Sequence, residues 1–213
     1  AVKSLASKKG GALAGLVLLL GLATVAWGTV TCTWFGLTPD MLPDWLKELS
    51  VPQLSNAYGD TQWPIFWKSE SGLYLTTAQN LQIFCFTLAL LQLSVAHLKG
   101  IAANRKTLKW IGEFGFLMQV VGMYWVVLSM VVSAEVFTFS EVIYGVPVGK
   151  LAIGLVAVGF VLSFIFSSYS GSVVESVLES CKNIISVLLG VVNVFSDIVS
   201  YIRLWAVGLA GAA

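Results

Sequence analysis

Five long apolar stretches divide this chain, and each is long enough to cross a lipid bilayer as a helix. They cover residues 11–35, 78–100, 109–132, 148–167 and 181–213. About 20 mainly apolar residues suffice to cross the hydrocarbon core as a helix. The pattern therefore predicts an all-α fold, a polytopic membrane helix bundle of about five transmembrane helices. The last stretch is too long to cross upright, so we expect that helix to be tilted or to project beyond the bilayer.

The charges of the loops alternate in sign from one loop to the next. The basic segments carry Lys3, Lys8 and Lys9 before the first stretch and Lys99, Arg105, Lys106 and Lys109 between the second and third. The loop at residues 36–77 carries Asp40, Asp44, Glu48, Asp60 and Glu70 against Lys47 and Lys68, and the loop after the third stretch carries Glu135 and Glu141. Because positively charged loops remain in the cytoplasm, we predict that the chain's N-terminus is cytoplasmic and that the fifth helix runs outward. Residues 36–77, rich in Trp, Tyr and Pro, are expected to form a structured outer loop.

Composition supports a membrane protein and excludes several other classes. The chain has 213 residues, of which 57% are hydrophobic and 11% charged, whereas soluble domains carry about 25% charged residues. The net charge of +1 gives no indication of a nucleic-acid partner. One histidine and three cysteines without a CxxC pair make a histidine-based metal cluster or a disulfide framework unexpected. No phosphate-binding or hydrolase motif occurs, so we expect no cofactor, no metal and no enzymatic activity in this chain on its own.

Arg203 is the most informative residue, because it lies inside the fifth apolar stretch. An arginine near the middle of a bilayer costs about 2.5–3.5 kcal/mol on insertion scales. A membrane protein that retains such a charge usually needs it, facing a partner or a water-filled path. The alternative is an arginine that reaches the interface with its long side chain or pairs within its own bundle.

A polar stripe leads toward Arg203 along the same predicted helix. Steps of three and four residues keep neighbours on one face of a helix. An ideal helix drifts by about 20° per heptad, so the stripe is slanted. As a whole it predicts one wall of an aqueous path from the cytoplasm, although polar residues that join neighbouring helices are the alternative for each one singly. Walking back from Arg203, the stripe comprises Ser200, Ser196, Asn193, Leu189, Ser186, Lys182, Glu179 and Glu175.

Other polar residues of the membrane stretches are weaker candidates. Tyr201 is able to donate its hydroxyl near the level of Arg203, whereas Asp197 lies on a different face. His97 is suited to relay protons near neutral pH, but an interfacial or packing role is the more common one. Four further residues have positions compatible with the same interior, which the sequence does not decide: Gln92, Ser94, Glu113 and Gln119.

The segment from Ser200 to Ala210 resembles a known family. Its residues Ser-Tyr-Ile-Arg-Leu-Trp-Ala-Val-Gly-Leu-Ala are similar to the SY-x-RLWA-x-x-LA segment of the membrane stator subunit, called subunit a or subunit I, of V-type and A-type rotary ATPases. Residues 24–36 resemble that family's early WG…FG helix, and residues 91–100 its middle QLS-x-x-H helix. The matches occur in family order and together cover most of the chain.

The resemblance implies a function. Arg203 would face a rotor ring of proteolipid subunits, each with an essential carboxylate, and half-channels would carry protons or sodium ions. Other stator or peripheral-stalk subunits would be partners, in a prokaryotic plasma membrane. Residues 1–213 would form a single transmembrane domain, a part of a larger subunit whose final helix is absent here. The residues we name for ion translocation are Arg203, Ser200, Ser196, Asn193, Glu179, Glu175 and Tyr201.

Two alternative hypotheses are open at this point. A secondary transporter or channel would use Arg203 as an interior substrate or ion site, and it would need no rotor ring. Such bundles often show repeat-related or discontinuous helices, and the sequence shows no internal repeat. A purely structural assembly subunit is the other alternative, in which apolar replacements along the stripe would leave ion flux unchanged.

Overall fold

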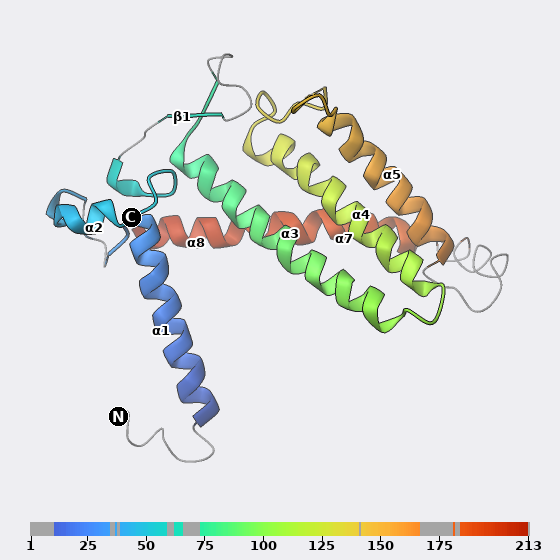
Figure 1. Cartoon of the computed structure of the whole chain (residues 1–213), viewed down its shortest axis with the longest axis horizontal. Coiled ribbons are helices and arrows are strands. Elements are labelled where there is room, and N and C mark those ends of the chain that lie inside the picture. The colour runs from blue at the N-terminus through green and yellow to red at the C-terminus, as the bar shows by residue number, and fades with distance from the viewer. Residues whose placement is uncertain are drawn as a thin grey trace. The chain divides into compact units, whose positions relative to one another are not determined.

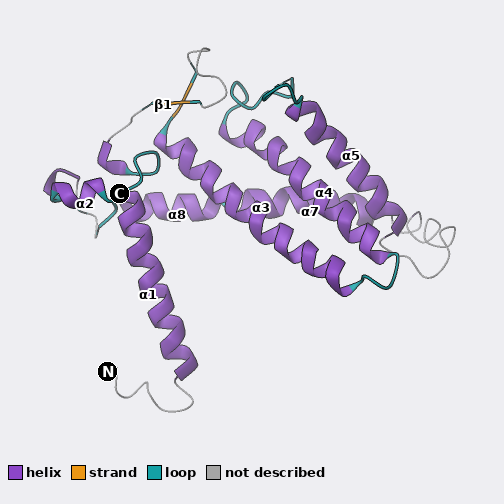
Figure 2. Ribbon diagram, in the orientation of Figure 1, coloured by secondary structure: helices purple, strands orange, loops and turns teal. Residues whose placement is uncertain are grey.

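The architecture comes from a computed structural model. It describes residues 11–34, 37, 39–58, 62–65, 73–140, 142–166, 181 and 184–212. Within these residues five helices are long and apolar enough to cross a membrane. The prediction of an all-α membrane protein with about five transmembrane helices is confirmed (Figure 2). The chain divides into two compact units, one made of residues 1–64, 74–80 and 208–213 and the other of residues 65–73 and 81–207.

The first unit contains one membrane helix and the described part of the predicted outer loop. The apolar side chains of the helix, such as Leu18 and Leu19, are exposed in the isolated chain, which suits contact with lipid. The helix ends at Cys32, whose φ of 56° is left-handed, and the backbone N–H of Val51 donates to the carbonyl of Val30. In chain order the elements are α1 (Gly11–Thr31), η1 (Pro39–Met41), α2 (Asp44–Glu48), η2 (Asn56–Tyr58), β1 (Trp63–Pro64) and β2 (Tyr74–Leu75), the two strands pairing antiparallel.

The second unit contains most of the membrane helices, and Figure 1 shows α4 and α5 lying alongside each other. The last part of the third span is a π-helix, η3, which continues α4 without a break. In chain order the elements of the second unit are α3 (Thr77–Ala103), α4 (Lys109–Val127), η3 (Leu128–Val132), α5 (Val148–Phe166), α7 (Ile184–Ser200) and α8 (Ile202–Ala212). Of α3 only the part from Leu81 onward belongs to this unit, and of α8 only the part up to Val207.

Small residues bring α4 and α5 into close backbone contact. A Cβ atom added to Gly159 would lie 2.5 Å from the carbonyl oxygen of Gly115, and one added to Gly122 would lie 2.5 Å from that of Ala152. Glycines at such positions let helices approach each other in membranes, where dispersion and hydrogen bonds replace the hydrophobic effect. This glycine contact therefore forms the packed centre of the second unit.

The fifth span departs from the expected continuous helix at one residue. Tyr201 separates α7 from α8. Its backbone N–H donates to the carbonyl of Ile198 at 3.1 Å, and its own carbonyl accepts from the N–H of Leu204 at 3.0 Å. Both bonds join residues three apart, as in a 3₁₀ turn, rather than four apart as in an α-helix. The span from Leu188 to Val207 still has the length and apolarity of a membrane-crossing helix. Its tilt stays a prediction.

Candidate functional site

Arg203 lies in α8, two residues beyond the interruption, with an exposed side chain. Its Nε donates to the backbone carbonyl of Ser200 at 3.3 Å, and its Nη2 donates to the hydroxyl of the same serine. Among the described residues no carboxylate forms an ion pair with Arg203. Asp197 in particular does not pair with it, in agreement with the prediction that the two lie on different faces. The guanidinium is thus folded onto its own helix and has no ion-pair partner in the part of the chain that the structure describes.

This arrangement leaves much of the hydrogen-bonding capacity of the guanidinium unused. An arginine carries five N–H donors and is not deprotonated in proteins. Two of these donors point to Ser200, so three remain for another acceptor. A planar guanidinium suits a carboxylate especially well, because two parallel N–H groups are able to meet its two oxygens. The site can therefore receive an anionic group from outside the described part of the chain.

The fifth span has one packed face and one uncovered polar face. Val194 and Ile198 are buried against the rest of the second unit. Asn193 and Ser196 are exposed, as is Arg203, and Ser200 is half-buried. At 100° per residue the exposed polar residues lie on the side of the helix away from Val194 and Ile198. The predicted stripe is thus a continuous surface from Asn193 to Arg203 that the described chain leaves uncovered.

Three predicted members of the stripe lie outside the described residues, namely Glu175, Glu179 and Lys182. Their assignment to the stripe stays a prediction from helical spacing.

Tyr201 lies on the packed side of the span and contacts a residue far away in the sequence. Its hydroxyl donates a hydrogen bond to Oε1 of Gln92, which lies in α3. Sequence spacing placed both residues at membrane depth but gave no sign that they meet. Periodicity shows which residues share a face of one helix, whereas a contact between two helices depends on how each is rotated.

Three of the remaining polar candidates, His97, Glu113 and Gln119, form contacts that join two helices. His97 Nδ1 lies 3.0 Å from Glu113 Oε2, and the imidazole stacks on Phe116 with ring centroids 5.8 Å apart. Gln119 is fully buried and donates to Ser163 at 2.7 Å. These residues contact one another rather than Arg203, so within the described chain they act as links between helices.

One further polar pair and one glycine contact also join two helices. The hydroxyl groups of Thr87 in α3 and Tyr124 in α4 lie 2.8 Å apart. Gly100 provides the space for Glu113, because a Cβ added there would lie 2.9 Å from Glu113 Oε2. No group of three metal-ligating side chains occurs in the ranges that the structure describes.

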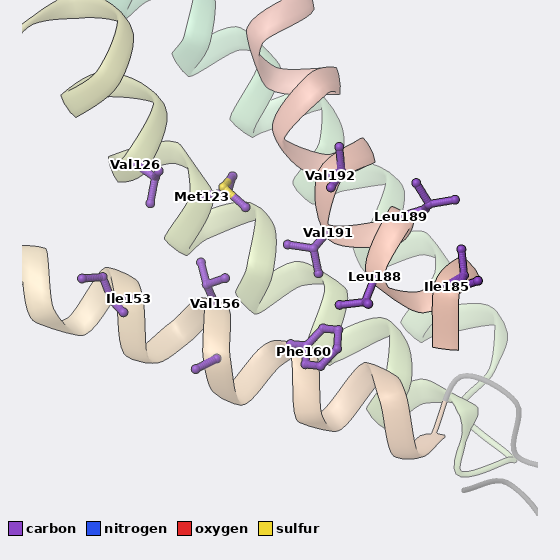
Figure 3. A pocket seen from close by; sticks show the side chains of 11 residues that line it. Met123, Val126, Ile153, Val156, Phe160, Ile185, Leu188, Leu189, Val191 and Val192 are labelled. Atoms are coloured by element: carbon purple, nitrogen blue, oxygen red, sulfur yellow. The ribbon is translucent and has the colours of Figure 1, made fainter. Parts of the chain in front are cut away.

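An apolar groove of about 690 Å³ separates α7 from α4 and α5 (Figure 3). Every side chain that lines it is aliphatic, aromatic or a thioether, so it offers no partner to an ion. Its lining comprises Met123 and Val126 from α4, Ile153, Val156, Ala157 and Phe160 from α5, and Ile185, Leu188, Leu189, Val191 and Val192 from α7. Leu189, which helical spacing assigns to the stripe, lines this apolar groove, so the groove adjoins the polar face of α7 that runs from Asn193 to Arg203.

These features define a polytopic α-helical membrane protein whose last described span carries an exposed arginine that no carboxylate of the described residues pairs. Comparison with known proteins shows what the chain is similar to. The chain is 39% identical over 198 residues to V-type ATP synthase subunit I 1 of Treponema pallidum, an alignment that covers 93% of this chain and 28% of that protein. It is 32% identical over 203 residues to V-type ATP synthase subunit I of Borreliella burgdorferi, covering 92% of this chain and 29% of that protein.

The chain is therefore homologous, over nearly its whole length, to a segment of V-type ATP synthase subunit I. This confirms the resemblance found in the sequence motifs. The chain spans less than a third of the length of either relative. No protein-family model matches it, and no solved structure matches it.

Proposed function

We propose that this chain is a membrane part of the stator subunit of a rotary V/A-type ATPase, and that it forms half-channels for protons or sodium ions against a rotor ring. The observation that carries the proposal is Arg203. It occupies the position of the arginine in the SY-x-RLWA segment, on the exposed face of its span, without a carboxylate partner in the described chain. Homology to V-type ATP synthase subunit I supports the proposal independently.

Arg203 acts as a fixed positive charge between two half-channels. A guanidinium stays charged at any physiological pH, and an opposite charge within a few ångströms favours the ionised form of a carboxyl group. A protonated ring carboxyl that approaches Arg203 therefore releases its proton before it passes. The proton leaves by one half-channel, and the carboxylate is protonated again from the other. Rotation of the ring is thereby coupled to ion movement across the membrane.

The polar face of α7 supplies one wall of the cytoplasmic half-channel. Asn193 and Ser196 are exposed there, and Ser200 continues the face up to the arginine. Glu175 and Glu179 extend the same stripe toward the cytoplasm by helical spacing. Ser200 has a second role, because its carbonyl and hydroxyl both accept from Arg203 and hold its guanidinium at the end of the stripe.

The partners follow from this mechanism. The exposed polar face meets a ring of proteolipid subunits, while exposed leucines and valines of the spans contact lipid. Other stator and peripheral-stalk subunits hold the chain against rotation, in a prokaryotic plasma membrane with the N-terminus of the chain in the cytoplasm. ATP chemistry takes place on other subunits, so the chain is not an enzyme on its own, and no nucleic acid takes part.

The test is ATP-driven ion flux into vesicles that carry the intact parent complex, wild type against Arg203→Ala. We expect the variant to assemble and to lose coupled flux, because nothing else forces the ring carboxylate to give up its proton. Leu204→Ala is the matched control, since Leu204 is a neighbouring exposed residue without charge. Normal coupled flux in an assembled Arg203→Ala complex would overturn the proposal.

A further inference from the structure

The bond between Tyr201 and Gln92 lies at the one residue where the fifth span is interrupted. Tyr201 belongs to neither α7 nor α8, and its hydroxyl donates to the side-chain oxygen of Gln92 in α3. The residues three and four positions from Gln92 share its face of α3, and they are all apolar: Leu88, Ala89, Val95 and Ala96. Where no water competes, an amide and a phenol that find each other satisfy groups that hydrocarbon would leave unpaired.

Tyr201 and Arg203 project to nearly opposite sides of the span. Tyr201 and Arg203 are two positions apart, and each position turns an α-helix by about 100°, so their side chains differ in direction by about 200° around the axis. Burial agrees with this estimate. Ile198, on the Tyr201 side, is fully buried, while Val207, one turn beyond Arg203, is 72% exposed. A contact that holds Tyr201 against α3 therefore also holds Arg203 on the uncovered side.

The interruption makes such a contact necessary. Around Tyr201 the backbone bonds join residues three apart, and a 3₁₀ turn advances by about 120° per residue against about 100° for an α-helix. A change between the two at one residue rotates everything beyond it by about 20°. At the surface of a helix, about 5–6 Å from its axis, that rotation displaces a group by about 2 Å. A displacement of that size separates a guanidinium from a carboxylate it would otherwise contact.

We propose that Gln92 is a positioning residue for ion translocation: by accepting the hydrogen bond of Tyr201, it fixes the rotation at which α8 presents Arg203 to the ring carboxylates. This inference rests on the proposed stator function, since it assumes that Arg203 meets a carboxylate outside the chain. It adds a residue of a different helix, about a hundred positions earlier in the sequence, to the group that determines how Arg203 acts.

The chain contains a matched control for this bond. Thr87, also in α3, pairs with the hydroxyl of Tyr124 at 2.8 Å. That bond has the same chemical character and begins on the same helix, but it leads to α4 and not to the span that carries Arg203. Its loss weakens the packing of α3 without freeing α8 to rotate.

The experiment uses the intact parent complex in vesicles, with two readouts. The first is ATP-driven ion flux divided by the rate of ATP hydrolysis. The second is disulfide cross-linking to a cysteine in the outer helix of the ring, from a single cysteine introduced by Val207→Cys or Leu204→Cys. The native Cys32, Cys85 and Cys181 are replaced by alanine beforehand, and Arg203 is retained. Cross-linking reports the rotation of α8 directly, and a merely structural loss of stability does not move it.

We expect Gln92→Met, which keeps the length of the side chain but lacks the acceptor, to lower the coupling ratio by about three- to fifteen-fold, the range that one interhelical hydrogen bond in a membrane produces. Tyr201→Phe should have the same effect, and the double variant should be no worse than either single one. The ratio of the cross-linking yields from Val207→Cys and Leu204→Cys should change, because the two positions differ by about 60° around the axis of α8. Gln92→Glu keeps an acceptor oxygen, so both readouts should stay close to their wild-type values. Thr87→Val should leave both readouts unchanged.

Each contrary result has a definite meaning. Wild-type coupling and cross-linking in Gln92→Met, beside lost flux in Arg203→Ala, would overturn the positioning role and leave the stator function intact. Normal flux in Arg203→Ala would overturn both proposals. If Gln92→Met does not assemble, Tyr201→Phe decides, because it removes one oxygen atom only, and an unchanged cross-linking pattern in it would overturn the positioning role. An equal shift in Thr87→Val would also overturn it, by showing that any bond of α3 has this effect.

Discussion

Replacing Gly159 by alanine should destabilise the contact between α4 and α5 for a reason that can be worked out from the backbone. The added Cβ would lie 2.5 Å from the carbonyl oxygen of Gly115 and 3.0 Å from the backbone nitrogen of Gln119. Ordinary van der Waals contact begins at 3.4 Å, so the two helices must separate locally by about 0.9 Å. Both obstacles include backbone atoms, which no change of rotamer can move away.

The magnitude follows from the cost of overpacking. Forcing an additional carbon into a well-packed interior costs about 1–3 kcal/mol. The same helix provides the control, because a Cβ added to Gly154 meets nothing within 4 Å. Both replacements change the intrinsic helix preference equally, so their difference isolates the packing. We expect Gly159→Ala to be less stable than Gly154→Ala by about 1–3 kcal/mol.

The assay is unfolding of the purified full-length subunit by increasing fractions of SDS in mixed micelles, followed by far-ultraviolet circular dichroism. The two variants are compared with the wild type under identical conditions. Equal unfolding free energies for Gly159→Ala and Gly154→Ala would refute the argument, because the close backbone contact would then have no energetic consequence. A larger loss of unfolding free energy in Gly154→Ala than in Gly159→Ala would mean that the tight contact of α5 lies at Gly154 and not at Gly159.

Two further predictions concern single hydroxyl groups. Ser200→Ala removes one of the two acceptors that hold Arg203, so coupled ion flux in the parent complex should fall several-fold without being lost. Ser196 has no bond to the arginine, so Ser196→Ala should reduce the flux less. Equal effects of the two replacements would contradict the holding role of Ser200. Ser163→Ala leaves the buried amide of Gln119 without its partner and should lower the unfolding free energy by about 1–3 kcal/mol, the cost of an unsatisfied buried group. Adding Gln119→Leu to that variant should recover part of the loss in the same SDS assay, and no recovery would refute the explanation.

The positions of the membrane helices follow closely from the sequence because hydropathy is a local property. The third span, expected at residues 109–132, is described as α4 and η3 from Lys109 to Val132. The fourth, expected at residues 148–167, is α5 from Val148 to Phe166. Lipid forces every backbone group in such a stretch to be satisfied internally, so a long apolar run leaves no other choice than a helix.

The interruption at Tyr201 was not predictable in the same way. Sharp changes in a helix are usually signalled by proline or by glycine and serine pairs, and the residues beside Tyr201 are Ser200 and Ile202. The interruption instead coincides with a contact to another helix, through Gln92. Information about that contact is distributed over two distant segments, and neither of them reveals it alone.

The glycines of α5 show the same limit at the level of packing. Gly154 and Gly159 have equal standing in the sequence, as small residues that let helices approach. The structure separates them, because Gly159 faces the backbone of α4 and Gly154 faces open space. The candidate site contains one residue that the sequence reveals and one contact that only the structure reveals. Arg203 stands out by its chemistry, whereas the role of Ser200 in holding it depends on a side-chain conformation that periodicity does not contain.

The apolar groove beside α7 has an electrical consequence. An isolated ion moved from water into a medium without polar partners faces a barrier of tens of kcal/mol, and the lining from Met123 to Val192 offers none. Whether an acyl chain or another helix fills the groove, it acts as an insulator on that side of α7. If α7 borders an ion path as proposed, that path is then confined to the adjoining polar face from Asn193 to Arg203, and ions cannot leak across the membrane through the groove.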